Sequence, residues 1–238
     1  MQHKSTCIAN PMIKSIFSIV VLAFLSATKI QAASTAPSTA FDLHTWKLQI
    51  PGPQEIKALQ NYSSAYFYLN DAREMCFHLD ASEKGTTPDA HYVRSELRHI
   101  LNWKSSESHS ISAEVRVVSN LKPDKVTVLQ IHGINANGAD APPLLRVAVN
   151  KGDLVAVIKT TNEGDKNDTV VLMKSAGTQP VKIEVLVKSG QLKISVNGVE
   201  KVDRSLAFWK FLNYFKAGCY PQTTEGTVDV IFRKLVAK

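Results

Sequence analysis

The chain has 238 residues, with 28 Lys or Arg against 21 Asp or Glu, which gives a formal net charge of +7 and a sequence pI of about 9.3. Its 44% of hydrophobic residues, 21% of charged residues and three cysteines exclude collagenous, disordered and disulfide-framework proteins. A mean hydropathy of -0.08 argues against a protein with several membrane spans.

The N-terminal segment has the pattern of a secretory signal peptide. Lys4 and Lys14 precede an apolar stretch at 16–27, and small residues follow it. This stretch is shorter than the roughly 18 to 20 residues of a membrane-spanning helix. We therefore expect residues 1–32 to be cleaved near Ala32, giving a secreted or periplasmic protein that leaves the membrane. The mature chain would keep 25 basic and 21 acidic residues, a net charge of +4.

From Phe41 onward, short β-branched or alternating runs are separated by turn clusters. This pattern predicts a flexible lead-in at 33–40 and one all-β domain at 41–238, a β-sandwich or jelly roll. Short helices are expected around 53–60 and 205–211. The predicted strands are Trp46–Ile50, Ile111–Val118, Lys125–His132, Leu144–Val149, Leu154–Thr160, Thr169–Met173, Val181–Val187, Gln191–Val196, Asn213–Tyr220 and Thr227–Leu235.

One segment, 92–98, alternates charge along a predicted strand. Side chains two residues apart lie on the same face of a strand, so Arg94, Glu96 and Arg98 should form one row. A solvated row of charges would be the ordinary interpretation. The functional interpretation is that Glu96 orients both guanidinium groups, which then offer planar donors to a carboxylate ligand.

Two further segments show the same alternation. Gln130 and His132 share one face of a strand, where a lone histidine is more often structural but can also remove a proton near neutral pH. In the segment 214–222, one face carries Tyr214, Lys216, Tyr220 and Gln222. Three such rows, rich in donors and poor in carboxylates, predict a groove on one sheet face for an extended anionic ligand.

These segments resemble the signatures of the alginate lyases of polysaccharide lyase family 7. The family motifs Arg-Ser/Thr-Glu-Leu/Val-Arg, Gln-Ile/Val-His and Tyr-Phe-Lys-Ala-Gly-x-Tyr-x-Gln occur in the same order at 94–98, 130–132 and 214–222. The segment 41–51 also resembles the opening strand of the family. The resemblance implies a β-jelly roll with a concave sheet as substrate groove, and depolymerisation of alginate by β-elimination.

The resemblance also implies roles for the catalytic residues. Arg94 and Gln130 would neutralise the uronate carboxylate, with a further hydrogen bond from His132, so that charge developing in the intermediate meets preorganised donors. Tyr220 would protonate the leaving oxygen, and either Tyr220 or His132 would remove the C5 proton. For guluronate, whose C5 hydrogen and leaving oxygen lie on opposite sides, His132 as base and Tyr220 as acid divide the work. In this family an Ile between the Gln and the His is associated with action on guluronate-containing regions, and Ile131 holds that position here. The resemblance therefore suggests a preference for guluronate or mixed blocks, although Ile131 faces away from the ligand.

The remaining motif residues are expected to bind or align substrate. Arg98 and Lys216 would hold neighbouring uronates, Glu96 would orient the arginines, and Tyr214 and Gln222 would line the groove. We expect no metal or other cofactor, because the histidines of the mature chain have no compact ligand spacing. Alginate is the expected partner, and we expect a monomer.

Three other functions are weighed against a lyase. A non-catalytic polysaccharide-binding jelly roll is the main alternative, since the fold does not decide function. A glycoside hydrolase needs two carboxylates, whereas the polar rows offer only Glu96. Nucleic-acid binding does not fit the signal peptide or the scattered lysines.

Cys76 and Cys219 could form a disulfide or remain buried thiols, and the sequence leaves this open.

Overall fold

The computed structural model describes residues 35–52, 54–85 and 92–238, and the predicted signal peptide lies outside them. Regular structure in these ranges is almost entirely β-strand, with a single short 3₁₀ helix, η1 (Pro37–Thr39). Among the described residues, no helix has the length and apolar character required to cross a membrane.

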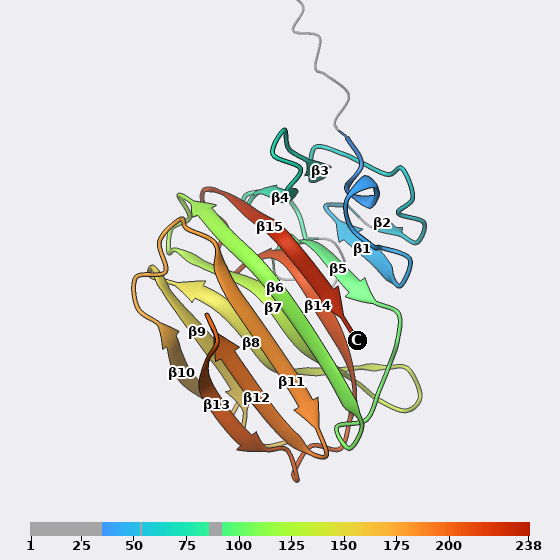
Figure 1. Ribbon diagram of the computed structural model, residues 1–238, viewed down its shortest axis with the longest axis vertical. Helices are drawn as coiled ribbons and strands as arrows, with labels where there is room; N and C mark the ends of the chain where they lie inside the picture. Colours follow the sequence, from blue (N-terminus) through green and yellow to red (C-terminus); the bar gives the residue numbers. More distant parts are fainter. Residues whose placement is uncertain (1–34, 53, 86–91) are drawn as a thin grey trace, which may run out of the picture. The chain divides into compact units, whose positions relative to one another are not determined.

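The strands form two antiparallel sheets that lie over each other in Figure 1, with the seven-stranded sheet in front. The eight-stranded sheet has the order β10 (Asn167–Met173), β9 (Asp153–Lys159), β8 (Asp140–Asn150), β7 (Lys125–Ile134), β14 (Leu212–Pro221), β5 (Ser95–His99), β1 (Trp46–Ile50) and β2 (Gln54–Ile56). The seven-stranded sheet has the order β13 (Val199–Ser205), β12 (Gln191–Val196), β11 (Val181–Lys188), β6 (Ser108–Ser119), β15 (Thr227–Ala237), β4 (Met75–Asp80) and β3 (Phe67–Leu69).

The core lies between the inner faces of the two sheets. Alternation along the strands puts every second side chain there, as β11 shows with its buried Val181, Ile183, Val185 and Val187. From the eight-stranded sheet, Leu97, Ile131 and Phe215 enter the same core, each at most 1% exposed. The polar side chains next to them in sequence must therefore point to the outer face. This arrangement confirms the predicted all-β jelly-roll sandwich.

The structure corrects several details of the sequence prediction. The expected helix at 205–211 is absent, and in the described part of 53–60 the chain forms β2 rather than a helix. Four strands were not in the predicted set, namely β2, β3, β4 and β13, whereas β5 overlaps the segment 92–98 that was expected to be a strand. The strands β2 and β3 have only three residues each, too few to show a period of two.

The described part of the segment 33–40 contacts the rest of the domain. Pro37 is buried within η1, and the amide N–H of Leu69 in β3 donates to the carbonyl of Thr35 over 2.8 Å. These contacts attach the segment to the seven-stranded sheet. The described residues from Thr35 on belong to one compact unit.

The two cysteines of the domain are free thiols, which answers the question that the sequence leaves open. Cys219 lies in the core, whereas the Sγ of Cys76 lies 3.6 Å from the carbonyl oxygen of Glu74. Burial raises the pKa of Cys219 and raises that of Cys76 to about 11. Both are therefore protonated and unreactive at neutral pH.

Candidate active site

The three sequence motifs lie on three adjacent strands, with β14 between β7 and β5 (Figure 1). In the register, Lys216 of β14 stands opposite Gln130 of β7 on one side and Arg98 of β5 on the other. Tyr214 stands opposite His132. The antiparallel pairing thus merges the three predicted rows into one polar surface on the outer face of the eight-stranded sheet.

This surface is hollowed, and the cavity has a volume of about 520 Å³. Five predicted site residues line it, and so do six residues that the motifs do not include. The lining consists of Lys47, Gln49, Glu55, Arg94, Arg98, His132, Ile134, Gly138, Asp140, Tyr214 and Lys216. Four of these are Lys or Arg and two are acidic; Lys47 and Glu55 pair over 2.8 Å and neutralise each other, which leaves three basic residues and Asp140. The hollow therefore favours an anionic ligand.

A buried polar network lies beneath the hollow and centres on Glu96, which is 0% exposed. Its Oε1 accepts a hydrogen bond from Nε2 of Gln130 over 2.5 Å, and its Oε2 lies 2.5 Å from Nζ of Lys216. A guanidinium nitrogen of Arg94 is 3.9 Å from the same Oε2. Lys216 also donates to Oε1 of Gln49 over 3.0 Å.

The network fixes the charge state of the carboxylate. Complete burial alone would raise the pKa of Glu96, but the charges of Lys216 and Arg94 and the hydrogen bonds outweigh this effect and lower it. Burial lowers the pKa of Lys216, and the Arg94 charge adds to that. Glu96 is thus an ionised group that holds its neighbours in place.

This geometry corrects the prediction for Glu96. Glu96 was expected to orient both arginines in the substrate-binding set, but it is 0% exposed and forms an ion pair with Arg94 and not with Arg98. Arg98 instead donates to the carbonyl of His99 over 3.0 Å and lies over the ring of Tyr214, 4.0 Å from its centroid. Arg98 therefore takes its orientation from an aromatic face.

His132 has the properties of a neutral base. Its Nδ1 is 2.9 Å from the carbonyl oxygen of Gly133, and because a carbonyl only accepts, Nδ1 carries the proton and Nε2 keeps its lone pair. Burial, aided by the Lys216 charge, lowers the pKa of His132 to about 4. The ring is stacked on Tyr214 with centroids 5.1 Å apart, which fixes its plane at the cavity wall.

Tyr220 borders the cavity through Arg94, whose guanidinium carbon is 4.5 Å from the ring centroid. Burial raises the pKa of Tyr220, against the lowering effect of the Arg94 charge, so the phenol is protonated at neutral pH. The strand bulges just before it, between Ala217 and Tyr220. Gly218 allows the bulge, because a Cβ there would lie 2.6 Å from the carbonyl oxygen of Ser95.

Gln222 lies at the end of β14 and is held by two hydrogen bonds. Its amide Nε2 donates to the hydroxyl of Thr127 over 2.9 Å and to the carbonyl of Tyr220 over 2.7 Å. The side chain thus ties the end of β14 to β7, next to Tyr220, rather than standing free for a ligand.

Several residues near the site carry no motif signal. Arg146 of β8 stands opposite Gln130, and its charge partly opposes the rise that burial causes in the pKa of Tyr220. Tyr92 lies edge-on to Tyr220 with ring centroids 6.3 Å apart. Asp140 lines the cavity at the start of β8. Leu144 and Ala148, two residues before and after Arg146, are apolar. The alternation of polar and apolar residues therefore does not reveal Arg146. Only the strand order brings it beside β7.

A jelly roll with a cationic hollow, a neutral histidine and a protonated tyrosine defines a protein of the class that acts on acidic polysaccharides. Residues 41–238 match the family model described as alginate lyase. The chain belongs to the alginate lyase family.

Relatives of known function or structure agree with this assignment. The chain is 28% identical to an alginate lyase of Photobacterium sp. (strain ATCC 43367) over 184 residues, which are 60% of this chain and 65% of that protein. A substrate complex of the family 7 alginate lyase A1-II' is similar with a TM-score of 0.76 and 30% identity, over 87% of this chain and 97% of the other. The alginate lyase PA1167 from Pseudomonas aeruginosa gives a TM-score of 0.75 and 25% identity, over 83% and 99% of the two chains.

Proposed function

We propose that the protein is a secreted, monomeric alginate lyase that cleaves the glycosidic bonds of guluronate-containing regions by β-elimination. The observation that carries this proposal is that a base able to accept a proton and an acid able to donate one lie near the same cationic hollow. His132 is neutral with a free lone pair on Nε2, and Tyr220 keeps its proton. The relatives named above act on or bind alginate, and the family assignment supports the same substrate here.

The first requirement of the reaction is to neutralise the uronate carboxylate, because the C5 hydrogen next to an ionised carboxylate is barely acidic. Arg94 lines the cavity, and Gln130 has a second amide hydrogen beyond the one it gives to Glu96. These groups are donors held by the buried network before substrate arrives. They stabilise the negative charge that moves onto the carboxylate when the C5 proton leaves.

The proton transfers then follow from the two protonation states. Nε2 of His132 accepts the C5 proton, the C5 electron pair forms the C4=C5 double bond, and the C4–O4 bond breaks. Tyr220 donates its proton to the departing O4, so that the products are an unsaturated uronate and a new free end. A base and an acid on separate residues suit guluronate, in which hydrogen and leaving group are on opposite sides. Ile131 is consistent with this preference but acts only through packing, since it is 0% exposed in the core.

The test is the release of an ultraviolet-absorbing unsaturated product from alginate without added metal. Tyr220→Phe should abolish release while circular dichroism and melting temperature stay close to wild type, because only the hydroxyl is removed. Separated guluronate and mannuronate blocks should be cleaved at clearly different rates, with guluronate faster. Absence of product from every block type, together with retained alginate binding, would instead identify a non-catalytic binding module. Analysis of the culture medium and size-exclusion chromatography test secretion and the monomeric state.

A further inference from the structure

A second hollow of about 600 Å³ lies beside the groove and shares no lining residue with it. It is formed by the loop before β6, the loop before β14 and the hairpin between β7 and β8. We propose that it is a second, non-catalytic binding site for uronate residues of the polysaccharide. This inference rests on the proposed function, since it takes alginate as the ligand.

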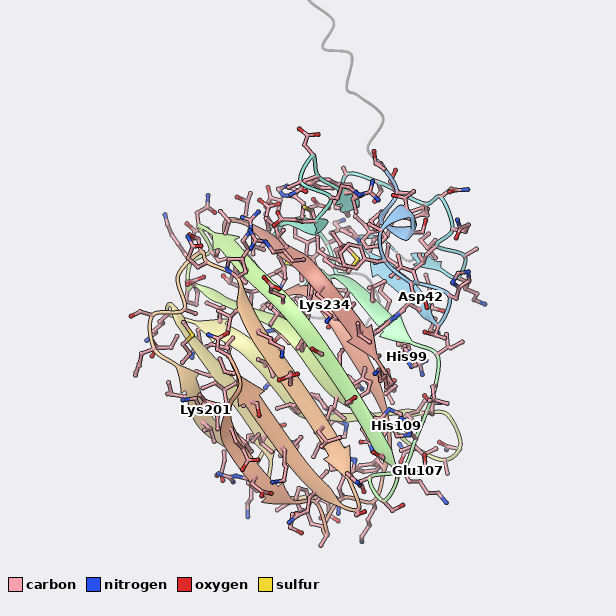
Figure 2. All side chains as sticks on the ribbon, in the orientation of Figure 1. Asp42, His99, Glu107, His109, Lys201 and Lys234 are labelled. Carbon is pink, nitrogen blue, oxygen red and sulfur yellow. The ribbon has the colours of Figure 1, made fainter. Side chains whose placement is uncertain are left out.

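The charges of the hollow fit a carboxylated sugar. Lys104 and Lys210, both exposed, line it from two different loops, and no acidic residue belongs to its lining. The nearest acidic residue of the first loop, Glu107, contacts the ring of His109 over 3.2 Å (Figure 2). The two ammonium groups therefore have no acidic neighbour within the lining and favour an anionic ligand.

The uncharged part of the lining fits a sugar ring. Phe211 is half-buried and meets the ring of Trp209 edge-on, with centroids 5.0 Å apart. The Trp209 side chain is fixed by a hydrogen bond from its Nε1 to Oδ1 of Asn213 over 2.8 Å. The polar residues Ser105 and Asn135 line the same hollow. Apolar ring surface with a few polar groups is the usual composition of a small-ligand site.

The position of the hollow connects it to the groove. Asn135 faces the second hollow, while Gly138 and Asp140 of the same hairpin line the groove. Trp209, which lines the second hollow, packs on Gly133. A Cβ added at Gly133 would lie 3.0 Å from Cζ2 of Trp209. A long polysaccharide that crosses the hairpin would contact both hollows, whereas cleavage of a trimer requires only the groove.

The experiment compares Lys104→Ala/Lys210→Ala with a matched control, Lys201→Ala/Lys234→Ala, which removes the same charge from exposed lysines remote from this loop (Figure 2). The first variant should raise the KM for polymeric alginate about fivefold, as expected for two exposed ion pairs. It should leave kcat, and the kcat/KM for a uronate trimer, at wild-type values. The control variant should match wild type on both substrates.

Direct binding separates this inference from the proposed function. In a Tyr220→Phe background, calorimetry with a uronate trimer should give two binding events, and Lys104→Ala/Lys210→Ala should remove one of them. A single event that the lysine substitutions do not change, or an equal rise of KM in the control variant, would overturn the second site. Failure of the wild-type protein to release unsaturated product would overturn the lyase assignment, whatever the number of binding events.

Discussion

The buried carboxylate of Glu96 gives the sharpest prediction, because its effects on stability and on catalysis can be separated. Glu96→Gln keeps the shape of the side chain but removes the counter-ion of Lys216, which is 2% exposed. Removing one member of a buried ion pair costs about 3 to 5 kcal/mol. For a domain of this size that corresponds to a fall in melting temperature of about 10 °C.

Glu96→Gln should also lower kcat by about a hundredfold, the usual effect of losing one preorganised donor. The carboxylate accepts from Gln130, and an amide in its place offers both a donor and an acceptor, so the orientation of Gln130 is no longer unique. The assay is the rate of product release at saturating alginate, measured at a temperature where the variant is folded by circular dichroism.

Glu74 provides the matched control, directly before β4 of the other sheet. It is 5% exposed and is paired with Arg116 over 2.6 Å and with Arg233 over 2.8 Å. Burial alone would raise its pKa, but the hydrogen bonds from Arg233, Asn70 and Arg116 lower it from 4.5 to about 2. That shift corresponds to about 3 kcal/mol of stability. Because the pKa is lower in the folded state, this stability is present above pH 4.5 and is lost as the pH falls toward 2.

Glu74→Gln should therefore melt at a lower temperature at neutral pH, as Glu96→Gln does, and keep wild-type kcat. If both variants lost activity to the same extent, the loss would come from general destabilisation. If Glu96→Gln kept wild-type kcat, Glu96 would have no role in positioning Gln130. Either result would refute the reasoning.

Two further predictions concern His132. Since burial lowers its pKa to about 4, His132 is a neutral base above this pH, and the acid limb of kcat/KM on guluronate blocks should lie near pH 4. An acid limb near pH 6.5 would show that another group, or an exposed histidine, acts as the base. Gly133→Ala should lower kcat and should lower stability by about 1 to 3 kcal/mol. A Cβ at this position would lie 2.7 Å from the carbonyl oxygen of Pro142. Relief of this clash would displace the carbonyl of Gly133 that holds Nδ1 of His132. Kinetics and thermal melting of the alanine variant check this, and wild-type values for both would contradict the contact.

The sequence predicted the class of fold and the central part of the site because both depend on local periodicity. Alternation along 94–98, 130–132 and 214–222 placed polar side chains on one face, and the structure puts Leu97, Ile131 and Phe215 on the other. The predicted ends of the strands were less accurate. Irregular register near Pro143 hides the start of β8 from a period of two, and the polar residues Asn167 and Asp168 hide the start of β10.

The tertiary structure decided what each polar residue does, because burial and partners depend on which strands are neighbours. The sequence placed Glu96 between two arginines, but the order β7-β14-β5 gives it Lys216 and Gln130 as partners and removes it from solvent. The full order of the sheet also adds Arg146 of β8 and Lys47 of β1, which lie outside the three motifs. The sequence by itself determined a donor-rich sheet face for an anionic ligand. Only the packing of the strands decided which donors are buried supports and which reach the ligand, since desolvation and charge pairing are properties of the assembled sheet.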